Sequence, residues 1–321
     1  MKILGRTVHK NGKNTIGPAD FCRMFACEMQ DLPEQVISGS KHINTTYHDA
    51  DWPEMEKYIL SVLQKISVPY IMRSRDENLE AFESGWRENL KALLCDGIST
   101  ESLKPKYFRT SKFLRYNKKL IVTENLNLEF DLFTLARYLI FARYLSSYED
   151  IYELGCGSCQ NLLLLTELFP AKKLYGLDWT KASTEITKVL AGKLGRHIEG
   201  AVFDMMNPDS DFAMKHGSAI ITVHALEQIG TAHDKLLSFL MRAKPGIVVH
   251  YEPIVEFYDE DNLLDQLALV YSQKRNYLSG FYTELCKLQE MNKIEIIAAF
   301  RPCLGGVVHE ASLMVWRPKG Q

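Results

Sequence analysis

The sequence predicts an α/β protein with a doubly wound, mostly parallel sheet, a terminal antiparallel strand pair and an N-terminal helical region. Up to residue 147, apolar side chains recur at three- and four-residue steps, which is typical of amphipathic helices. From residue 148, short apolar runs alternate with helix-length segments, which indicates strands joined by crossover helices. We therefore expect residues 1–147 to form a helical region and residues 148–321 to form the α/β domain.

The N-terminal region is expected to contain three long helices. The first begins at the start signal Asp51-Trp52-Pro53 and extends to Ile66 along an apolar stripe. Residues 79–93 repeat the pattern, and residues 130–145 form a third, more apolar helix. Before these helices, residues 20–30 are compatible with a short helix, and residues 39–51 are expected to form a loop.

The second half is expected to alternate strands with helices until its last 60 residues or so, where the order changes. Residues 263–291 are expected to form one long helical stretch. Two strand-like runs follow it, and they must pair antiparallel or lie apart because no crossover helix separates them. The predicted parallel strands are residues 151–154, 174–177, 201–203, 219–223 and 247–249, the helices between them are residues 160–168, 181–194 and 231–242, and the final runs are residues 294–300 and 313–316.

Composition excludes several classes of protein. The chain has 321 residues, 46% of them apolar, and 38 basic residues nearly balance 40 acidic ones, which argues against disorder and against a generally basic nucleic-acid binder. No apolar run approaches the roughly 18–20 residues of a membrane span, and residues 1–13 show no apolar core of a signal peptide. Seven scattered cysteines suit reduced thiols better than a disulfide framework. We expect a cytoplasmic protein without a membrane partner; the sequence does not specify an oligomeric state.

The most informative segment is a glycine-containing loop between the first predicted strand and the helix that follows it. It reads Tyr-Glu-Leu-Gly-Cys-Gly-Ser-Cys-Gln-Asn over residues 152–161. Glycines at such a turn allow the backbone to approach a ligand closely, and the next helix presents free amides to an anionic group. Ligands of open α/β sheets bind outside the carboxyl ends of the strands, which is where this loop lies.

The spacing of this loop resembles motif I of the class I S-adenosylmethionine (SAM) methyltransferases. Its pattern is Glu153, Gly155 and Gly157, whereas a dinucleotide-binding fingerprint needs glycine at position 160, where the chain has glutamine. The family often has a third glycine where this chain has Cys159. The resemblance covers residues 148–318 and implies that SAM is the cofactor.

Residues farther along the chain extend this resemblance. Asp178 ends the second strand, where the family uses an acidic residue to accept hydrogen bonds from the ribose hydroxyls. Asp204 ends the third strand, where the family contacts the adenine amino group, and Met205 is expected against the ring. Asn161, at the end of the glycine loop, completes the predicted cofactor-binding residues of this half. An aspartate after a strand also commonly caps the next helix and binds no ligand. The prediction therefore depends on the succession of motif I and the two strand-end aspartates, and not on either aspartate alone.

Residues 104–119 contain seven basic residues, interleaved aromatic residues and no acid. This pattern is compatible with a nucleic-acid surface, with a solvated basic face or with a lid over the donor. We favour the lid because the segment precedes the predicted donor-binding domain. Arg115 is then predicted to bind the donor carboxylate, and Tyr107 and Arg109 to bind the substrate.

Polar residues after the fourth and fifth strands are the candidates for the transfer step. His224 lies in a loop that resembles motif IV of the family, near the methyl donor, and is predicted to be a general base. The other candidates lie on the same loop, after the fifth strand, or between the last two strands. The predicted catalytic residues are His224, Glu227, His250 and Tyr251, and the further predicted substrate-binding residues are Glu252, Arg301 and His309.

The resemblance implies a SAM-dependent methyltransferase that moves a methyl group to O or N of a small molecule, such as a sugar, a natural product or a peptide side chain. The helical extension with Tyr107-Phe108-Arg109 is similar to that of some bacterial enzymes acting on sugars or natural products. The alternatives are a nucleic-acid methyltransferase, a non-catalytic SAM-binding interaction protein and an aminopropyl transferase. The loop at residues 221–228 lacks the Asn/Asp-Pro-Pro-aromatic signature of amino-group nucleic-acid methyltransferases. No metal is expected, because the Cys156 and Cys159 pair lies within the glycine loop.

Overall fold

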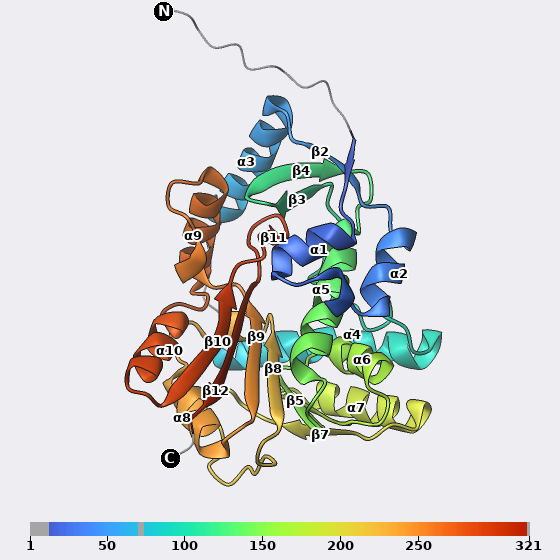
Figure 1. The fold of residues 1–321 in the computed structure, drawn as a ribbon, viewed down its shortest axis with the longest axis vertical. Helices are drawn as coiled ribbons and strands as arrows, with labels where there is room; N and C mark the ends of the chain where they lie inside the picture. Colours follow the sequence, from blue (N-terminus) through green and yellow to red (C-terminus); the bar gives the residue numbers. More distant parts are fainter. Residues whose placement is uncertain (1–12, 70–73, 320–321) are drawn as a thin grey trace, which may run out of the picture.

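The computed structural model describes residues 13–69 and 74–319, and it contains two β-sheets that lie one above the other in Figure 1. The prediction for residues 1–13 falls outside the described ranges except at Lys13. The larger sheet has seven strands in the order β10-β12-β9-β8-β5-β6-β7. Its strands are β5 (Asp150–Leu154), β6 (Lys173–Asp178), β7 (Ile198–Val202), β8 (Ala219–Val223), β9 (Ile247–Glu252), β10 (Ile294–Phe300) and β12 (Ser312–Pro318).

Strand directions in the large sheet confirm the predicted fold class. Strand β5 pairs in parallel with β6 and β8, and β7 and β9 continue the parallel sheet on either side. Strand β12 runs antiparallel to both β9 and β10. The carboxyl ends of the five parallel strands therefore meet along one edge of the sheet, with the antiparallel pair at its side.

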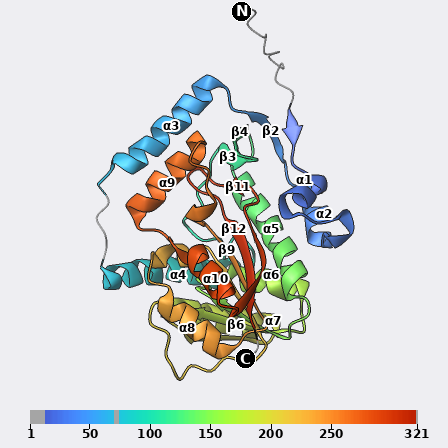
Figure 2. The ribbon, with the colours of Figure 1, turned by 60° about the vertical axis from the view of Figure 1, so that its left-hand side comes forward.

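Both faces of the large sheet are covered by helices, as a doubly wound sheet requires. Successive residues of a strand point to opposite faces, and Ile151 and Tyr152 accordingly belong to two different core clusters. One face packs against α5, α6 and α7, and the other packs against α8 and α10 (Figures 1 and 2). These helices are α5 (Leu128–Leu145), α6 (Gln160–Leu168), α7 (Lys181–Leu194), α8 (Asp234–Ala243) and α10 (Phe281–Glu290).

A second sheet of five short strands lies in the region that was predicted to be helical. Its order is β1-β2-β4-β3-β11, and β11 comes from near the C-terminus, pairing Leu304 with Tyr116. The sheet therefore draws strands from both sides of the predicted boundary at residues 147 and 148. The predicted loop at residues 39–51 contains β2, a strand stabilised by pairing with a distant segment and not by a local pattern. The bounds are β1 (Asn14–Thr15), β2 (Thr46–Asp49), β3 (Phe113–Tyr116), β4 (Lys119–Thr123) and β11 (Leu304–Gly305).

Two of the helices before β3 begin at a residue whose side chain caps them, and one of these residues, Asp51, belongs to the predicted start signal. The Asp51 side chain accepts a hydrogen bond from the Glu54 amide at 2.9 Å, and Ser74 does the same for Glu77 at 3.2 Å. Helix α4 packs against α7, and Glu83 of α4 accepts hydrogen bonds from the first amides of α7. The bounds are α1 (Pro18–Phe25), α2 (Glu34–His42), α3 (Trp52–Ser67) and α4 (Arg75–Asp96), with a short 3-10 turn at Met29–Asp31.

The stretch predicted as one helix over residues 263–291 is two helices, α9 (Leu263–Arg275) and α10. Asn276 ends α9 in the left-handed region at φ 51°, and Gly280 precedes α10 at φ 77°. The two positive φ angles break the helix, and residues with short or absent side chains tolerate that conformation. Short 3-10 turns also occur at Leu226–Ile229 and Val255–Phe257. No helix within the described residues is long and apolar enough to cross a membrane.

Candidate active site

A cavity of about 860 Å³ lies at the carboxyl ends of the parallel strands, between the large sheet, α4 and the small sheet. Its size falls within the range of small-molecule sites. Residues from both halves of the chain line it, including twelve that the sequence singled out. These are Tyr107, Arg109, Glu153, Gly155, Gly157, Asn161, Asp178, Asp204, Met205, His224, Glu227 and His309.

The glycine loop after β5 closely contacts two neighbouring segments of the cavity wall. Gly155 has φ 72°, and a Cβ there would lie 2.5 Å from the Cβ of Ala225. Gly157 has φ 50°, and a Cβ there would lie 2.7 Å from Cζ2 of Trp86 on α4. Both positions combine a left-handed backbone with a close approach, so neither tolerates a larger side chain without rearrangement.

Asp178, the last residue of β6, holds this loop in place. Its Oδ2 accepts a hydrogen bond from the Gly157 amide at 2.9 Å, and its Oδ1 accepts from the amide and hydroxyl of Thr180. Burial raises the pKa of Asp178, and these hydrogen bonds oppose that shift. Each carboxylate oxygen has two lone pairs, so Oδ2 keeps acceptor capacity on the cavity side.

Glu153 and Arg137 form a buried polar group under the loop. Asn161 donates to Oε1 of Glu153 at 2.5 Å, whereas Oε2 of Glu153 has no hydrogen-bond partner among the described residues. Burial raises the pKa of Glu153 to about 8. Arg137 of α5 donates to Phe133, Thr134, Gln160 and Asn161, which uses four of its five N–H groups.

Arg137 was not predicted as a site residue. The sequence did contain a signal for it, since Arg137 is a cation in the middle of the most apolar helix. Two further residues of the wall were also missed. Phe82 lies with its ring centroid 6.1 Å from that of Trp86 and 6.0 Å from that of Trp179. Trp86 lies within the predicted helix of residues 79–93, and it is 8% exposed, with its ring forming part of both the core and the cavity lining.

Asp204, just after β7, is linked to the N-terminal half of the chain. Its Oδ2 forms an ion pair with Arg75, the first residue of α4, and its Oδ1 accepts from the Met206 amide at 3.0 Å. Burial alone would raise the pKa of Asp204, but these partners outweigh it and lower the pKa. This contact joins the start of α4 to the end of the cavity where the sequence predicts adenine.

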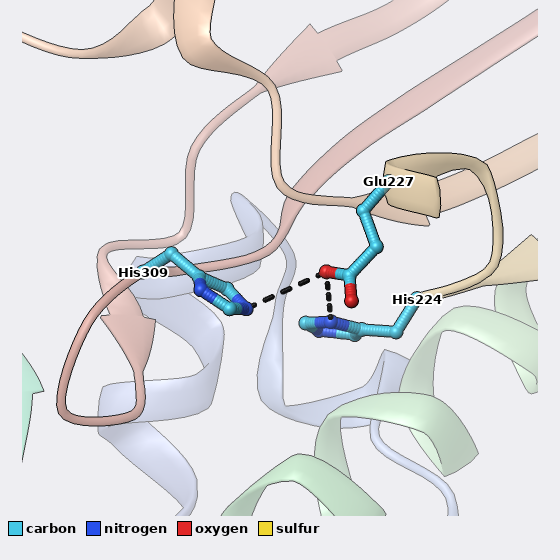
Figure 3. A group of neighbouring side chains, drawn as sticks. All are labelled: His224, Glu227 and His309. Carbon is cyan, nitrogen blue, oxygen red and sulfur yellow. Dashed lines mark hydrogen bonds and ion pairs between the residues drawn. The ribbon is translucent and has the colours of Figure 1, made fainter. Parts of the chain in front are cut away.

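A cluster of His224, Glu227 and His309 faces the other end of the cavity (Figure 3). Oε2 of Glu227 lies 3.4 Å from Nδ1 of His224 and 3.5 Å from Nε2 of His309. Burial alone would lower the pKa of His224, but the Glu227 carboxylate raises it, while burial lowers the pKa of His309 to about 4. The residue after His224 is the one that contacts Gly155, so the cluster adjoins the glycine loop.

His250 does not reach the cavity, which corrects its predicted catalytic role. Strand alternation turns its side chain into the core, where it is 0% exposed. Its Nε2 accepts a hydrogen bond from the indole of Trp316 at 3.0 Å, so Nδ1 carries the proton and faces Thr222 at 2.9 Å. Burial lowers the pKa of His250 to about 3. A neutral imidazole with both nitrogens engaged has no capacity to accept a proton from a substrate.

Tyr251 and Glu252 also lie behind the cavity wall and not on it. The ring of Tyr251 stacks on Phe133 at 5.2 Å between centroids and is 1% exposed. Oε1 of Glu252 accepts a hydrogen bond from the Ala225 amide at 3.0 Å, and burial raises the pKa of Glu252 to about 7. The two residues therefore support the wall and the turn that carries His224, instead of contacting a substrate.

Arg115 and Arg301 form a buried ionic cluster with Asp265 and Glu310, which corrects both of their predicted ligand roles. Arg115 is 0% exposed and pairs with Asp265 and, at 3.0 Å, with Glu310. Arg301 pairs with Asp265 at 2.7 Å and with Glu310 at 3.5 Å. Their guanidinium groups are neutralised inside the protein and do not line the cavity.

This buried ionic cluster holds the hairpin that carries His309. Arg115 contacts both neighbours of His309, through a hydrogen bond to the Val308 carbonyl at 3.0 Å and the ion pair to Glu310. The hairpin itself is tight, because a Cβ at Gly305 would lie 2.5 Å from the Cα of Glu310. Arg115 therefore positions His309, although it touches no part of the cavity itself.

The seven basic residues of residues 104–119 do not form one surface. Arg115 is buried, Lys118 pairs with Asp259 and Lys119 pairs with Asp49. Lys104 lies 4.0 Å from Glu101, and Arg109 lines the cavity. This distribution takes Arg115 and Arg109 out of any exposed basic surface and pairs three of the lysines with acids.

No family model matches this chain, and no curated protein sequence matches it. Solved structures with a similar fold include a geranyl diphosphate methyltransferase in complex with GPP and sinefungin. It is 13% identical, with a TM-score of 0.47, over 75% of this chain and 98% of that one.

Two further solved structures resemble this chain at similarly low identity. An O-methyltransferase from a trans-AT PKS multienzyme of Brevibacillus brevis, in complex with S-adenosyl-L-homocysteine, is 14% identical with a TM-score of 0.42 over 58% of this chain and 71% of that one. The cyclase SpnF is 13% identical with a TM-score of 0.44 over 58% of this chain and 82% of that one. Because one fold hosts many functions, the activity of this chain has to be argued from its own residues.

Proposed function

We propose that this protein is a SAM-dependent methyltransferase that acts on O or N of a small molecule. The observation that carries the proposal is the donor half of the cavity, where a left-handed glycine loop, a strand-end aspartate and an unpartnered buried carboxylate oxygen converge. Each of these three features suits one part of SAM, and together they occupy one end of a single cavity.

The residues present fit the amino-acid part and the nucleoside part of SAM. Oε2 of Glu153 would accept a hydrogen bond from the α-ammonium group, and the remaining N–H of Arg137 would donate to the α-carboxylate. Arg137 thus takes the part that the sequence assigned to Arg115. Asp178 would accept from the ribose hydroxyls, and Asp204 and Met205 would contact the adenine.

The acceptor half of the cavity supports binding of a small molecule. Tyr107 and Arg109 on one side and the His224, Glu227 and His309 cluster on the other enclose the remaining space. SAM supplies a methyl group on a sulfonium, and the acceptor lone pair forms a bond to that carbon as the carbon–sulfur bond breaks and a neutral thioether leaves. The cavity contributes by aligning the acceptor with the donor. The cluster of His224, Glu227 and His309 contributes by removing the acceptor's proton or by stabilising the charge on the acceptor.

Calorimetry with SAM and with S-adenosylhomocysteine tests the proposal. We expect both ligands to bind and to raise the melting temperature, because the contacts described above do not involve the methyl group. NAD serves as the control ligand, since the loop lacks the third glycine of a dinucleotide site. An absence of heat and of thermal shift with both SAM and S-adenosylhomocysteine would contradict the proposal.

Glu153 gives a second expected result, which concerns pH. Its pKa is raised to about 8, so the free protein holds a proton there at neutral pH, whereas the ammonium of SAM favours the carboxylate. Binding should therefore release a proton, and SAM affinity should rise between pH 6 and 7.5, by up to about tenfold per pH unit. Calorimetry in buffers with different ionisation enthalpies measures the released proton.

Two variants make this pH result specific to Glu153. Glu153→Gln should weaken binding and remove its pH dependence. Glu129→Gln is the matched control, since Glu129 also lines the cavity and burial raises its pKa to about 7. A pH dependence that survives in Glu153→Gln and disappears in Glu129→Gln would assign the titrating group to the acceptor half.

A further inference from the structure

We propose that His224, Glu227 and His309 bind a divalent transition-metal ion at the acceptor end of the cavity. Among residues 13–69 and 74–319, these three side chains offer ligand atoms that all lie within 4.8 Å of one another. Two imidazoles and one carboxylate form a ligand set that suits Zn²⁺ and Fe²⁺. The sequence predicted no metal, because its only closely spaced candidate pair, Cys156 and Cys159, lies within the glycine loop, and no local spacing connects His309 with the other two residues of the cluster.

The separations within the cluster fit ligands around an ion better than hydrogen bonds. With metal–ligand bonds of about 2.0–2.2 Å, neighbouring ligands of a tetrahedral site lie about 3.3–3.6 Å apart. The two separations from Oε2 of Glu227 are 3.4 and 3.5 Å. Both exceed the 2.7–2.9 Å of a charge-assisted hydrogen bond. The third edge, between the two histidines, is at most 4.8 Å and would have to shorten by up to about 1.5 Å in a tetrahedral site.

The surroundings of the three side chains also favour a cation. Oε1 of Glu227 accepts a hydrogen bond from Gln228 at 2.8 Å, which fixes the carboxylate with Oε2 directed at the two histidines (Figure 3). Nδ1 of His309 has no hydrogen-bond partner among the described residues, so neither nitrogen of that ring makes a strong hydrogen bond. Glu129 and Glu252 add negative charge close to His224.

Each ligand is held by the fold before any ion arrives. His224 follows β8 with φ 50°, a strained conformation that the Tyr251 carbonyl and the Glu252 carboxylate stabilise through the amides of His224 and Ala225. Glu227 lies on the adjoining 3-10 turn. His309 is fixed through Arg115, which binds the residues on either side of it. Such support is typical of metal ligands.

Three protein ligands leave a coordination position open toward the cavity, as in catalytic zinc sites. This step rests on the proposed function: an acceptor oxygen would take this position and lose its proton to solvent at neutral pH, because a bound metal lowers the pKa of a coordinated hydroxyl. The metal site itself is inferred without reference to SAM and is tested separately from it.

The test is a titration of the chelator-treated, dialysed full-length protein with Zn²⁺ by calorimetry and with Co²⁺ by absorption spectroscopy. We expect one ion per chain and cobalt bands typical of nitrogen and oxygen ligands. His224→Ala, Glu227→Gln and His309→Gln should each weaken binding by about a hundredfold or more, with the melting curve of each variant showing that it is folded. His48→Ala is the matched control, because His48 pairs with Glu54 at 3.0 Å without a third ligand.

Three outcomes would overturn the metal site. They are no stoichiometric binding in the unaltered protein, binding that persists in all three ligand variants, and a near-ultraviolet thiolate band, which would assign the ion to cysteine ligands. SAM binding measured on the same preparations separates this result from the proposed function. Metal binding without SAM binding contradicts the methyltransferase, and SAM binding without metal binding contradicts only the metal site.

Discussion

Replacing Arg115 with methionine is expected to lower the free energy of unfolding by about 3–5 kcal/mol, the cost of leaving buried charges without their partner. Among the described residues, Asp265 and Glu310 would retain Arg301 as their one cation and the Asp259 amide as a donor to Asp265, in a place with no access to water. The free energy of unfolding of Arg115→Lys should lie between those of the unaltered protein and Arg115→Met. An ammonium keeps the positive charge but lacks the fork that reaches both carboxylates and the Val308 carbonyl. Urea denaturation followed by fluorescence measures all three proteins.

The matched control for this result is Lys119→Met, on the strand that pairs with β3. Lys119 and Asp49 form an exposed ion pair at 2.7 Å, and its loss should cost about 0.5 kcal/mol or less. The same experiments test the role that the sequence assigned to Arg115. If Arg115→Met were as stable as Lys119→Met but bound SAM weakly, Arg115 would be the residue that binds the donor carboxylate. The role proposed for Arg137 would then be wrong.

Replacing Asp178 with alanine is expected to weaken SAM binding by about 1–3 kcal/mol, or roughly 5- to 150-fold. Two effects add in this variant. The ribose hydroxyls lose their acceptor, and the Gly157 amide loses the hydrogen bond that sets the glycine loop. Asp178→Asn should be almost as weak, because an amide nitrogen would face either the Gly157 or the Thr180 donors. Calorimetry with S-adenosylhomocysteine measures both variants.

Asp150→Asn provides the control for the Asp178 variants. Asp150 begins β5 at the opposite end of the sheet and pairs with Lys215 at 2.6 Å, away from the cavity. Its replacement should leave SAM affinity unchanged. If Asp178→Ala bound SAM as tightly as Asp150→Asn does, Asp178 would be a residue of the turn alone.

The donor half could be predicted because its residues follow one another in the order of the strands. Parallel strands bring their carboxyl ends to one edge, so Glu153, Asp178 and Asp204 had to converge once the strands were recognised. Residues of the acceptor half were also predicted, but the meeting of His309 with His224 could not be predicted in this way. His309 reaches His224 only because β11 pairs with β3, and nothing in either local pattern specifies that pairing.

The errors in the predicted site have a common physical cause, which is that partners far apart in sequence decide what a polar residue does. The acids that neutralise Arg115 lie 150 and 195 residues away from it. His250 is engaged by Trp316 on a neighbouring strand. A run of basic residues or a histidine at a strand end looks free in the sequence until the fold supplies its partner.

The pairing of β11 with β3 in the small sheet has a consequence for the order in which the protein folds. During synthesis, the segment with β3 leaves the ribosome long before Leu304 does. The edge of β3 therefore waits for β11, and the charge of Arg115 waits for Glu310, which lies 195 residues later in the chain. Pairing that distant is slow, and an unpaired edge invites association with other chains. We therefore expect the small sheet to be completed only after Leu304 has left the ribosome, with a nascent chain that depends on chaperones until then.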